Sequence, residues 1–182
     1  HAVWTGRMAP EKAPHLAIDA CRLAGMPLRL MGPRHDPGYF EQEVAPRLGG
    51  DVEYLGHGGV DDVAALVRGD AVPVVTPTWE EPFGLIVAEA LASATPVAAF
   101  RRGAMAELVD ESTGCLAHAD DVADLARAIV TAASLDRAAC RRRAEERFSA
   151  AVMTDAYEAW FASHVGHDGQ RELDGAAIAG AA

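Results

Sequence analysis

The sequence predicts an α/β fold, doubly wound around a mostly parallel sheet, and two observations support this prediction. Short apolar runs alternate with helical patterns as far as Ala117, after which the chain becomes helical. Half of its 182 residues are hydrophobic, which is enough for a sizeable core. Strands that alternate with helices form right-handed βαβ units, and such units place the strands parallel in one sheet.

The expected strands are short, apolar and separated by turn residues. Gly32 and Pro33 follow the second strand, and Gly49 and Gly50 stand shortly before the third. The strands are expected over residues 1–5, 28–31, 52–55, 71–76, 96–100 and 114–117.

The expected helices have recognisable ends. Gly25 closes the first helix, Asp61 and Asp62 favour the first turn of the third, and Asp120 and Ser149 suit N-cap positions. The helices are expected over residues 14–24, 37–48, 60–68, 84–92, 103–109, 120–133, 136–147 and 149–164. We expect one Rossmann-like domain over residues 1–165. Residues 166–182 are rich in Gly and Ala without periodicity, which predicts a disordered tail.

Charge and cysteine content narrow the classes of function. Lys and Arg number 16 and Asp and Glu 27, so the net charge is −11. This balance argues against general binding to nucleic acid or to an anionic membrane. No apolar run reaches the roughly 18 residues of a membrane span. Three isolated cysteines give no disulfide framework or zinc spacing and fit a reducing cytoplasm, the expected location.

Two cations follow the first predicted strand, at the edge where open parallel sheets bind ligands. Gly6 would let a ligand approach the backbone closely. Arg7 offers a planar fork for phosphate oxygens, and Lys12 offers a mobile point charge. Either residue alone would be an ordinary surface charge, but together they indicate an anion site.

A second group of candidate residues lies around the fourth helix. Glu81 stands in a turn, and Phe83, Gly84 and Leu85 lead to a helix start whose free N–H groups can bind an anion. Apart from Glu89 that helix is apolar, which predicts that it is buried on all sides. A buried, ionised Glu89 would need a polar partner, from the protein or from a ligand.

Together these residues indicate a nucleotide-sugar site. Arg7, Lys12 and the helix start would hold a diphosphate, while Glu81 and Glu89 would accept hydrogen bonds from sugar hydroxyls. A two-carboxylate hydrolase is the obvious rival, but it gives no role to the two cations. The purely structural alternative has Glu81 solvated and Glu89 bound to a neighbouring backbone group.

The residues that carry this interpretation also resemble a known family. Gly6-Arg7, four residues and Lys12, then Glu81-Pro82-Phe83-Gly84-Leu85, three residues and Glu89, then Thr95-Pro96-Val97, are similar to the retaining family-four glycosyltransferases with two Rossmann domains, of GT-B type. The resemblance runs from about Val3 to the helix around Tyr157. It covers only the C-terminal, donor-binding half of such enzymes.

The resemblance implies a role for each matching residue. Arg7 and Lys12 match the pair that holds the donor diphosphate, and Glu81 matches the carboxylate that contacts the transferred sugar. Glu89 matches the residue that binds the ribose, and Gly84 and Leu85 match backbone donors near the sugar and phosphate. The loops with Gly32, Gly56 and His57 lie where the family receives the base. It further implies sugar transfer with retention from a nucleoside diphosphate sugar, with no metal and no cofactor.

Three positions depart from the family pattern. Ala13 and Ala94 stand where glycine is usual, and the segment from Gly103 to Glu107 is a looser version of a Gly-rich turn. Because each change exchanges one small residue for another, we expect altered loops and an intact site.

The chain begins within an expected strand, so we expect it to be part of a longer protein whose N-terminal, acceptor-binding domain is missing. Such a piece is expected to bind nucleotide without turning over. Two other classes remain open: a ligand-free regulatory or interaction domain, and a related sugar-nucleotide epimerase or phosphorylase domain.

Overall fold

The computed structural model describes residues 1–68 and 72–179, with side chains described as far as His164. The chain divides into two compact units, His1–Ala144 and Glu145–Ala182, and each is treated by itself. The first unit contains the sheet and the candidate site. The second consists of the end of one helix and a further long helix.

The first unit is built on a six-stranded parallel sheet, as predicted. The strand order is β3-β2-β1-β4-β5-β6, the order of a doubly wound Rossmann-like fold. Trp4 pairs with Leu30, and Phe100 pairs with Ala117. The strands are β1 (Ala2–Thr5), β2 (Leu28–Met31), β3 (Val52–Tyr54), β4 (Val72–Val75), β5 (Val97–Phe100) and β6 (Gly114–Ala117).

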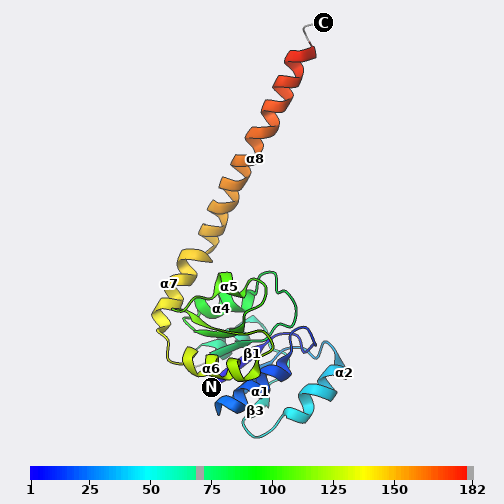
Figure 1. Ribbon diagram of the computed structural model, residues 1–182, viewed down its shortest axis with the longest axis vertical. Coiled ribbons are helices and arrows are strands. Elements are labelled where there is room, and N and C mark those ends of the chain that lie inside the picture. The colour runs from blue at the N-terminus through cyan, green and yellow to red at the C-terminus, as the bar shows by residue number, and fades with distance from the viewer. Residues whose placement is uncertain (69–71, 180–182) are drawn as a thin grey trace. The chain divides into compact units, whose positions relative to one another are not determined.

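Helices cover both faces of this sheet. Figure 1 shows α1 and α6 on one face and α4 and α5 on the other. The helices are α1 (Pro14–Ala24), α2 (Pro37–Tyr39), α3 (Val60–Val67), α4 (Leu85–Ala92), α5 (Met105–Leu108), α6 (Val122–Ala132), α7 (Arg137–Arg147) and α8 (Ala150–Ala179). The core lies between α1, α6 and the sheet, where Ile18, Leu125 and Ile129 are fully buried against Phe100.

Several predicted boundaries coincide with the observed ones because the local signals are strong. Gly25 ends α1 in the left-handed conformation with φ of 62°, and its N–H bonds to Arg22 O and Cys21 O. The strand β2 ends before Gly32, which has φ of 151°. Ser149 is within 3.4 Å of the N–H of Val152, as expected for an N-cap of α8.

Two predicted helices differ from the structure. The helix expected over 37–48 divides into α2, a π-helical turn η1 (Phe40–Val44) and a 3-10 turn η2 (Ala45–Arg47), because Pro46 cannot donate to a regular helical ladder. The N-cap of α6 is Asp121 and not Asp120. Asp121 accepts from the N–H of Asp124, whereas Asp120 is left-handed with φ of 64° and bonds to Arg102.

The last helix is longer than predicted. We expected it to end at His164 and the tail from residue 166 to be disordered, but α8 extends to Ala179. Many residues between 170 and 179 are strong helix formers, such as Ala, Leu, Glu, Gln and Arg. Periodicity was absent there, but a helix can continue without an amphipathic pattern. Residues 180–182 lie outside the described part of the chain.

Candidate functional site

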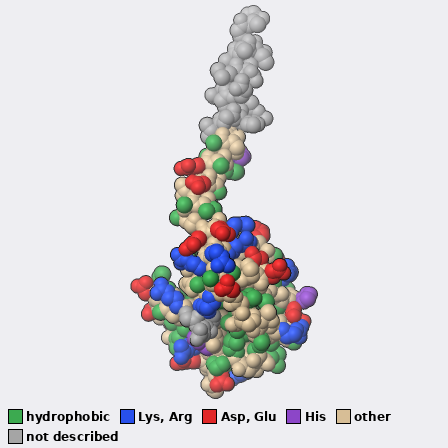
Figure 2. Space-filling view, turned by 90° about the vertical axis from the view of Figure 1, so that its left-hand side faces the viewer, with side chains coloured by type: hydrophobic (Ala, Val, Ile, Leu, Met, Phe, Trp, Pro, Cys, Tyr) green, Lys and Arg blue, Asp and Glu red, His purple; other side chains and the backbone are tan. Residues whose placement is uncertain are grey.

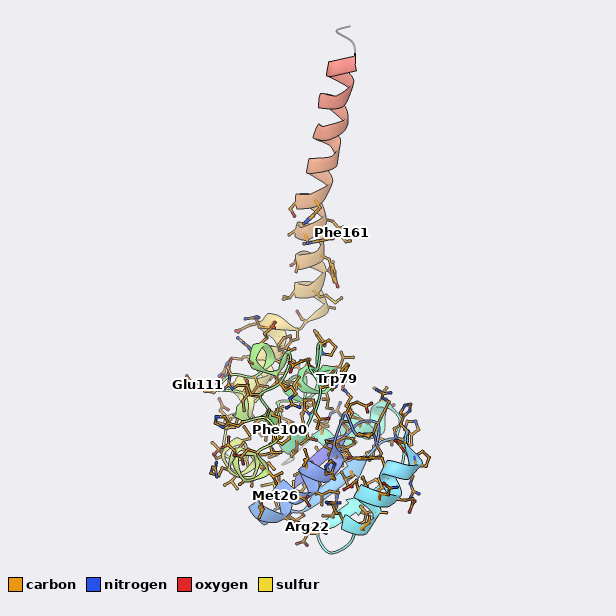
Figure 3. All side chains as sticks on the ribbon, turned by 45° about the vertical axis from the view of Figure 1, so that its right-hand side comes forward. Arg22, Met26, Trp79, Phe100, Glu111 and Phe161 are labelled. Atoms are coloured by element: carbon orange, nitrogen blue, oxygen red, sulfur yellow. The ribbon has the colours of Figure 1, made fainter. Side chains whose placement is uncertain are left out.

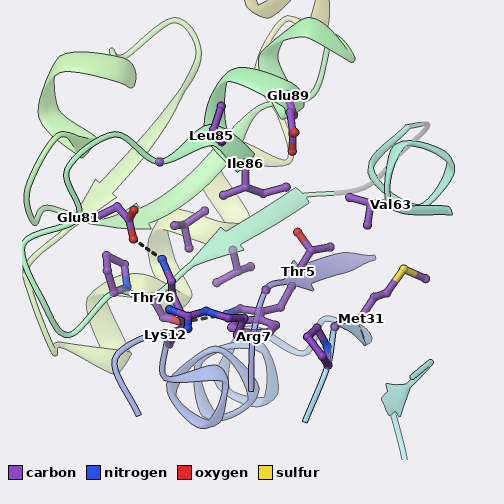
Figure 4. A pocket seen from close by; sticks show the side chains of 18 of the residues that line it. Thr5, Arg7, Lys12, Met31, Val63, Thr76, Glu81, Leu85, Ile86 and Glu89 are labelled. Carbon is purple, nitrogen blue, oxygen red and sulfur yellow. Dashed lines mark hydrogen bonds and ion pairs between the residues drawn. The ribbon is translucent and has the colours of Figure 1, made fainter. Parts of the chain in front are cut away.

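A cleft of about 500 Å³ opens beyond the carboxyl ends of β1, β2 and β4. Nearly all of the predicted site residues line it (Figure 4). They are Gly6, Arg7, Lys12, Gly32, His57, Glu81, Phe83, Gly84, Leu85 and Glu89. Gly56 is not among the lining residues, but its carbonyl accepts a hydrogen bond of 2.8 Å from the N–H of Gly32.

The floor of the cleft depends on close backbone contacts between two loops. A Cβ atom on Gly32 would lie 1.8 Å from the carbonyl oxygen of Gly6, closer than real atoms allow. The N–H of Gly6 donates to Met31 O at 3.1 Å. Glycine at position 32 is therefore required by this close contact between the two loops.

The turn that carries Lys12 is fixed by the end of β4. The buried hydroxyl of Thr76 bonds to the carbonyls of Lys12 and Ala13 at 2.9 and 3.0 Å. It also accepts from the indole N–H of Trp4 at 3.1 Å. A second link joins the same segments, because the N–H of Thr78 donates to Glu11 O at 2.9 Å. These contacts bring the loop after β4 beside the loop after β1.

Lys12 and Glu81 meet across this junction. The Lys12 ammonium forms an ion pair with Glu81 Oε2, drawn as a dashed line in Figure 4. Their side chains are 26% and 13% exposed, so the pair is only partly solvated. The indole N–H of Trp79 donates to the same carboxylate oxygen at 3.0 Å.

Arg7 also has protein partners. Its guanidinium lies 3.2 Å from a carboxylate oxygen of Glu11 and 3.3 Å from Nε2 of His35. The Arg7 side chain is 48% exposed, so this ion pair is weak and readily exchanged for another anion. Both predicted cations therefore lie at the cleft with acidic partners from the protein.

The turn that carries Glu81 is held by the loop between β5 and α5. The N–H of Gly103 donates to the Glu80 carboxylate at 2.8 Å, and the N–H of Ala104 donates to Glu81 O at 2.8 Å. A Cβ atom on Gly103 would lie 2.3 Å from Glu81 O, and Gly103 has φ of 56°. The backbone of Glu81 is thus fixed by residues more than twenty positions away.

The predicted burial of α4 is wrong. Val87, Ala90 and Leu91 are buried, but Glu89 is exposed and Leu85 is 66% exposed. One side of the helix packs on the sheet and the other faces the cleft. In Figure 4, Glu89 points from α4 toward the cleft, apart from the Lys12–Glu81 pair. Solvent therefore reaches Glu89, and a buried charge is no longer an argument for a ligand.

The residue that precedes α4 is a glycine in a conformation that disfavours other residues. Gly84 is left-handed with φ of 79°, and a Cβ atom there would lie 2.3 Å from the methyl carbon of Met105. The first N–H groups of α4 lie beside the cleft, since Leu85 and Ile86 line it.

The two alanines that depart from the glycine pattern occupy glycine-like conformations. Ala13 has φ of 44° and Ala94 has φ of 55°. An L-residue in this region costs about 1–2 kcal/mol. The backbone that glycine would favour is therefore preserved at both positions, with strain.

Several residues in or beside the cleft were not predicted from the sequence. Thr76, Trp79 and Glu80 act through side-chain contacts that no spacing rule reveals. Met31 and Ile86 line the cleft as apolar wall residues. A polar residue directly after an apolar strand was the one available signal for Thr76.

Among the described residues, no group of three or more His, Cys, Asp or Glu side chains is arranged to hold a metal ion. No helix in the described part of the chain is both long and apolar enough to cross a membrane. On the face drawn in Figure 2, acidic and basic side chains are interspersed.

The fold and the cleft define a Rossmann-like α/β domain whose candidate site lies at the carboxyl edge of its sheet. A family model, glycosyl transferases group 1, matches residues 1–134. The chain belongs to this family.

Known proteins of this class are similar over most of the chain. D-inositol 3-phosphate glycosyltransferase of Pseudarthrobacter chlorophenolicus is 30% identical over an alignment of 193 residues. The alignment covers 92% of this chain and 44% of that protein. The crystal structure of AviGT4, a glycosyltransferase involved in avilamycin A biosynthesis, has a TM-score of 0.76 and 29% identity, covering 87% of this chain and 48% of that one.

A second solved structure is HepE of Anabaena in complex with UDP and glucose. It has a TM-score of 0.74 and 25% identity, covering 89% of this chain and 48% of that one. The chain thus spans less than half the length of these relatives. The resemblance to one half of a GT-B glycosyltransferase is confirmed.

Proposed function

We propose that this chain is the donor-binding half of a retaining glycosyltransferase and that its cleft binds a nucleoside diphosphate sugar. The observation that supports the proposal is the meeting of Arg7, Lys12, Glu81 and Glu89 with the start of α4 around one cleft. Two cations and a helix start suit phosphate groups, and two carboxylates suit hydroxyls.

The diphosphate would replace the carboxylates that pair with the two cations in the free protein. Lys12 and Arg7 are paired with Glu81 and Glu11, respectively, and both pairs are partly exposed. A diphosphate carries more charge than a carboxylate and can reach both cations at once. As the bond to the sugar breaks, the developing charge on the leaving diphosphate would be stabilised by Lys12, Arg7 and the N–H groups of α4.

The carboxylates would then bind the remainder of the donor. Glu81 would accept a hydroxyl of the transferred sugar, and Glu89 would accept the ribose hydroxyls. The base would lie between the loops with Gly32 and His57, near the turn at Gly56. Both His57 and Gly32 line the same cleft, which supports this placement.

The relatives support a nucleotide-sugar donor but do not identify which nucleotide or which sugar it contains. The Anabaena protein was crystallised with UDP and glucose, and the Pseudarthrobacter relative is a D-inositol 3-phosphate glycosyltransferase. Because the chain spans less than half of each, we propose that acceptor binding needs an N-terminal domain and that this chain alone binds nucleotide without transfer. We further propose metal-independent transfer, no cofactor and a cytoplasmic location.

A thermal-shift panel of UDP, GDP and ADP tests the proposal. At least one diphosphate should raise the melting temperature, and Arg7→Ala and Glu89→Ala should reduce the shift. The matched controls are Arg29→Ala and Glu53→Ala, which remove an exposed ion pair outside the cleft and should leave the shift unchanged. No shift with any diphosphate would instead favour a ligand-free regulatory or interaction domain.

A further inference from the structure

One carboxylate oxygen in the cleft has two donors of different kinds. Glu81 Oε2 accepts from the Lys12 ammonium and from the Trp79 indole N–H, the latter at 3.0 Å. The ammonium also lies 5.3 Å from the centre of the Trp79 ring. Lys12, Glu81 and Trp79 thus form one contact group, and Trp79 has no role in the site described so far.

Trp79 is a large side chain that lies at the surface. It is 42% exposed, whereas the side chain of Glu81, to which its indole N–H donates, is only 13% exposed. Trp79 lies in the loop after β4, whereas Phe100 of β5 is fully buried; both are labelled in Figure 3. Burial in the core therefore does not explain the tryptophan, whereas its contact with Glu81 does.

The backbone of Glu81 needs no help from Trp79. Its carbonyl is held by the N–H of Ala104 at 2.8 Å, and Gly103 packs directly on it. The freedom that remains is rotation of the Glu81 side chain. Lys12 restrains that rotation only while its ammonium stays on the carboxylate.

We propose that Trp79 is a positioning residue that keeps Glu81 Oε2 in place when Lys12 turns to the donor diphosphate. This inference rests on the proposed function. With Oε2 held by the indole N–H, Oε1 is left to accept a hydroxyl of the sugar. Trp79 thereby acts on recognition of the sugar and leaves recognition of the nucleotide unchanged.

The test removes the N–H and keeps the ring. Trp79 is replaced by benzothienylalanine, in which sulfur takes the place of the indole N–H, and Kd is measured for UDP and UDP-glucose. The ratio of Kd for UDP-glucose to Kd for UDP should rise about tenfold, the loss expected for one hydrogen bond to a charged group. Kd for UDP alone should stay within about twofold, because the lost contact is not one to the nucleotide.

Trp160→Phe is the matched control, since it removes another exposed indole, tilted against the His164 ring, and should leave the ratio unchanged. An unchanged ratio in the benzothienylalanine protein would overturn the proposal. Equal losses for both ligands would also overturn it, because they would show a general structural role.

A ligand-free measurement separates this proposal from the proposed function. The indole N–H resonance of Trp79 should move in Glu81→Gln and stay in place in Glu53→Gln. If wild-type protein binds neither UDP nor UDP-glucose, UDP-based donor recognition fails, and the inference about sugar recognition fails with it. The positioning contact is then judged by the resonance alone, and a resonance unmoved by Glu81→Gln would overturn that contact too.

Discussion

Lys12 and Glu81 are 69 residues apart in the sequence and form a partly buried ion pair in the cleft. The contact joins the loop after β1 to the loop after β4. Thr76 and Thr78 hold these two loops together through bonds to the carbonyls of Lys12 and Glu11. The pair therefore links the two loops that border the cleft and places a cation and a carboxylate side by side there.

A double-mutant cycle should show that the Lys12–Glu81 pair contributes to the free energy of unfolding. Lys12→Met, Glu81→Gln and the double variant should give a coupling energy of about 1–3 kcal/mol in urea unfolding, because removing one partner leaves the other poorly solvated. The control cycle uses the exposed pair Arg29–Glu53, whose coupling should be below about 1 kcal/mol. Equal coupling in the two cycles would contradict this account.

Gly103→Ala should lower the free energy of unfolding far more than Gly25→Ala does, although both glycines are left-handed. Gly103 and Gly25 have φ of 56° and 62°, but a Cβ atom at position 103 would lie 2.3 Å from Glu81 O, while position 25 has nothing within 4 Å. We expect a loss of about 1 kcal/mol for Gly25→Ala and at least about 2 kcal/mol for Gly103→Ala. Similar losses by denaturant titration would show that the contact with Glu81 adds nothing.

Ala94→Gly should stabilise the protein. Ala94 has φ of 55°, so replacing it with glycine relieves about 1–2 kcal/mol of strain in the folded state. Because glycine also has more conformational freedom in the unfolded chain, folding loses about 0.5–1 kcal/mol of this gain. The expected net gain is the difference, up to about 1.5 kcal/mol. Ala88→Gly, in the middle of α4, is the control and should lose about 1 kcal/mol. A loss in both variants would refute the strain at Ala94.

Acid should destabilise the protein partly through His15. Burial lowers the pKa of His15 below its usual value of 6.5, and the charge of Arg47 lowers it further. The unfolded chain therefore binds a proton at His15 before the folded protein does, so stability falls as the pH drops from about 6.5 to the folded-state pKa. His15→Gln keeps a polar group near the Tyr39 hydroxyl and should flatten this fall between about pH 7 and 5. An unchanged pH profile of the unfolding free energy would contradict the assignment.

The sequence predicted the parts of the fold that local chemistry controls. Gly25 marks the end of α1, and short apolar runs mark β4 and β5, so a parallel, doubly wound sheet followed from their alternation with helices. It also predicted which residues would meet at the carboxyl edge of the sheet, including Lys12 and Glu89. This prediction was possible because the carboxyl ends of all strands in a parallel sheet lie at the same edge.

The sequence could not predict contacts that depend on packing between distant segments. The apolar stretch around Glu89 does not reveal which side of α4 faces the sheet, so its burial was overestimated. The bond between Glu80 and Gly103 depends on how the β5–α5 loop folds back. Likewise, the N-cap of α6 is Asp121, whereas Asp120 pairs with Arg102, and the sequence does not distinguish the two aspartates.

The most direct test of the central claim is calorimetric titration with a nucleoside diphosphate and its monophosphate, using the base that gives the largest thermal shift. The account predicts one site per chain, at least about tenfold tighter binding of the diphosphate, and loss of most of that difference in Lys12→Met. Equal affinity for diphosphate and monophosphate, or no binding of any of UDP, GDP and ADP, would contradict it.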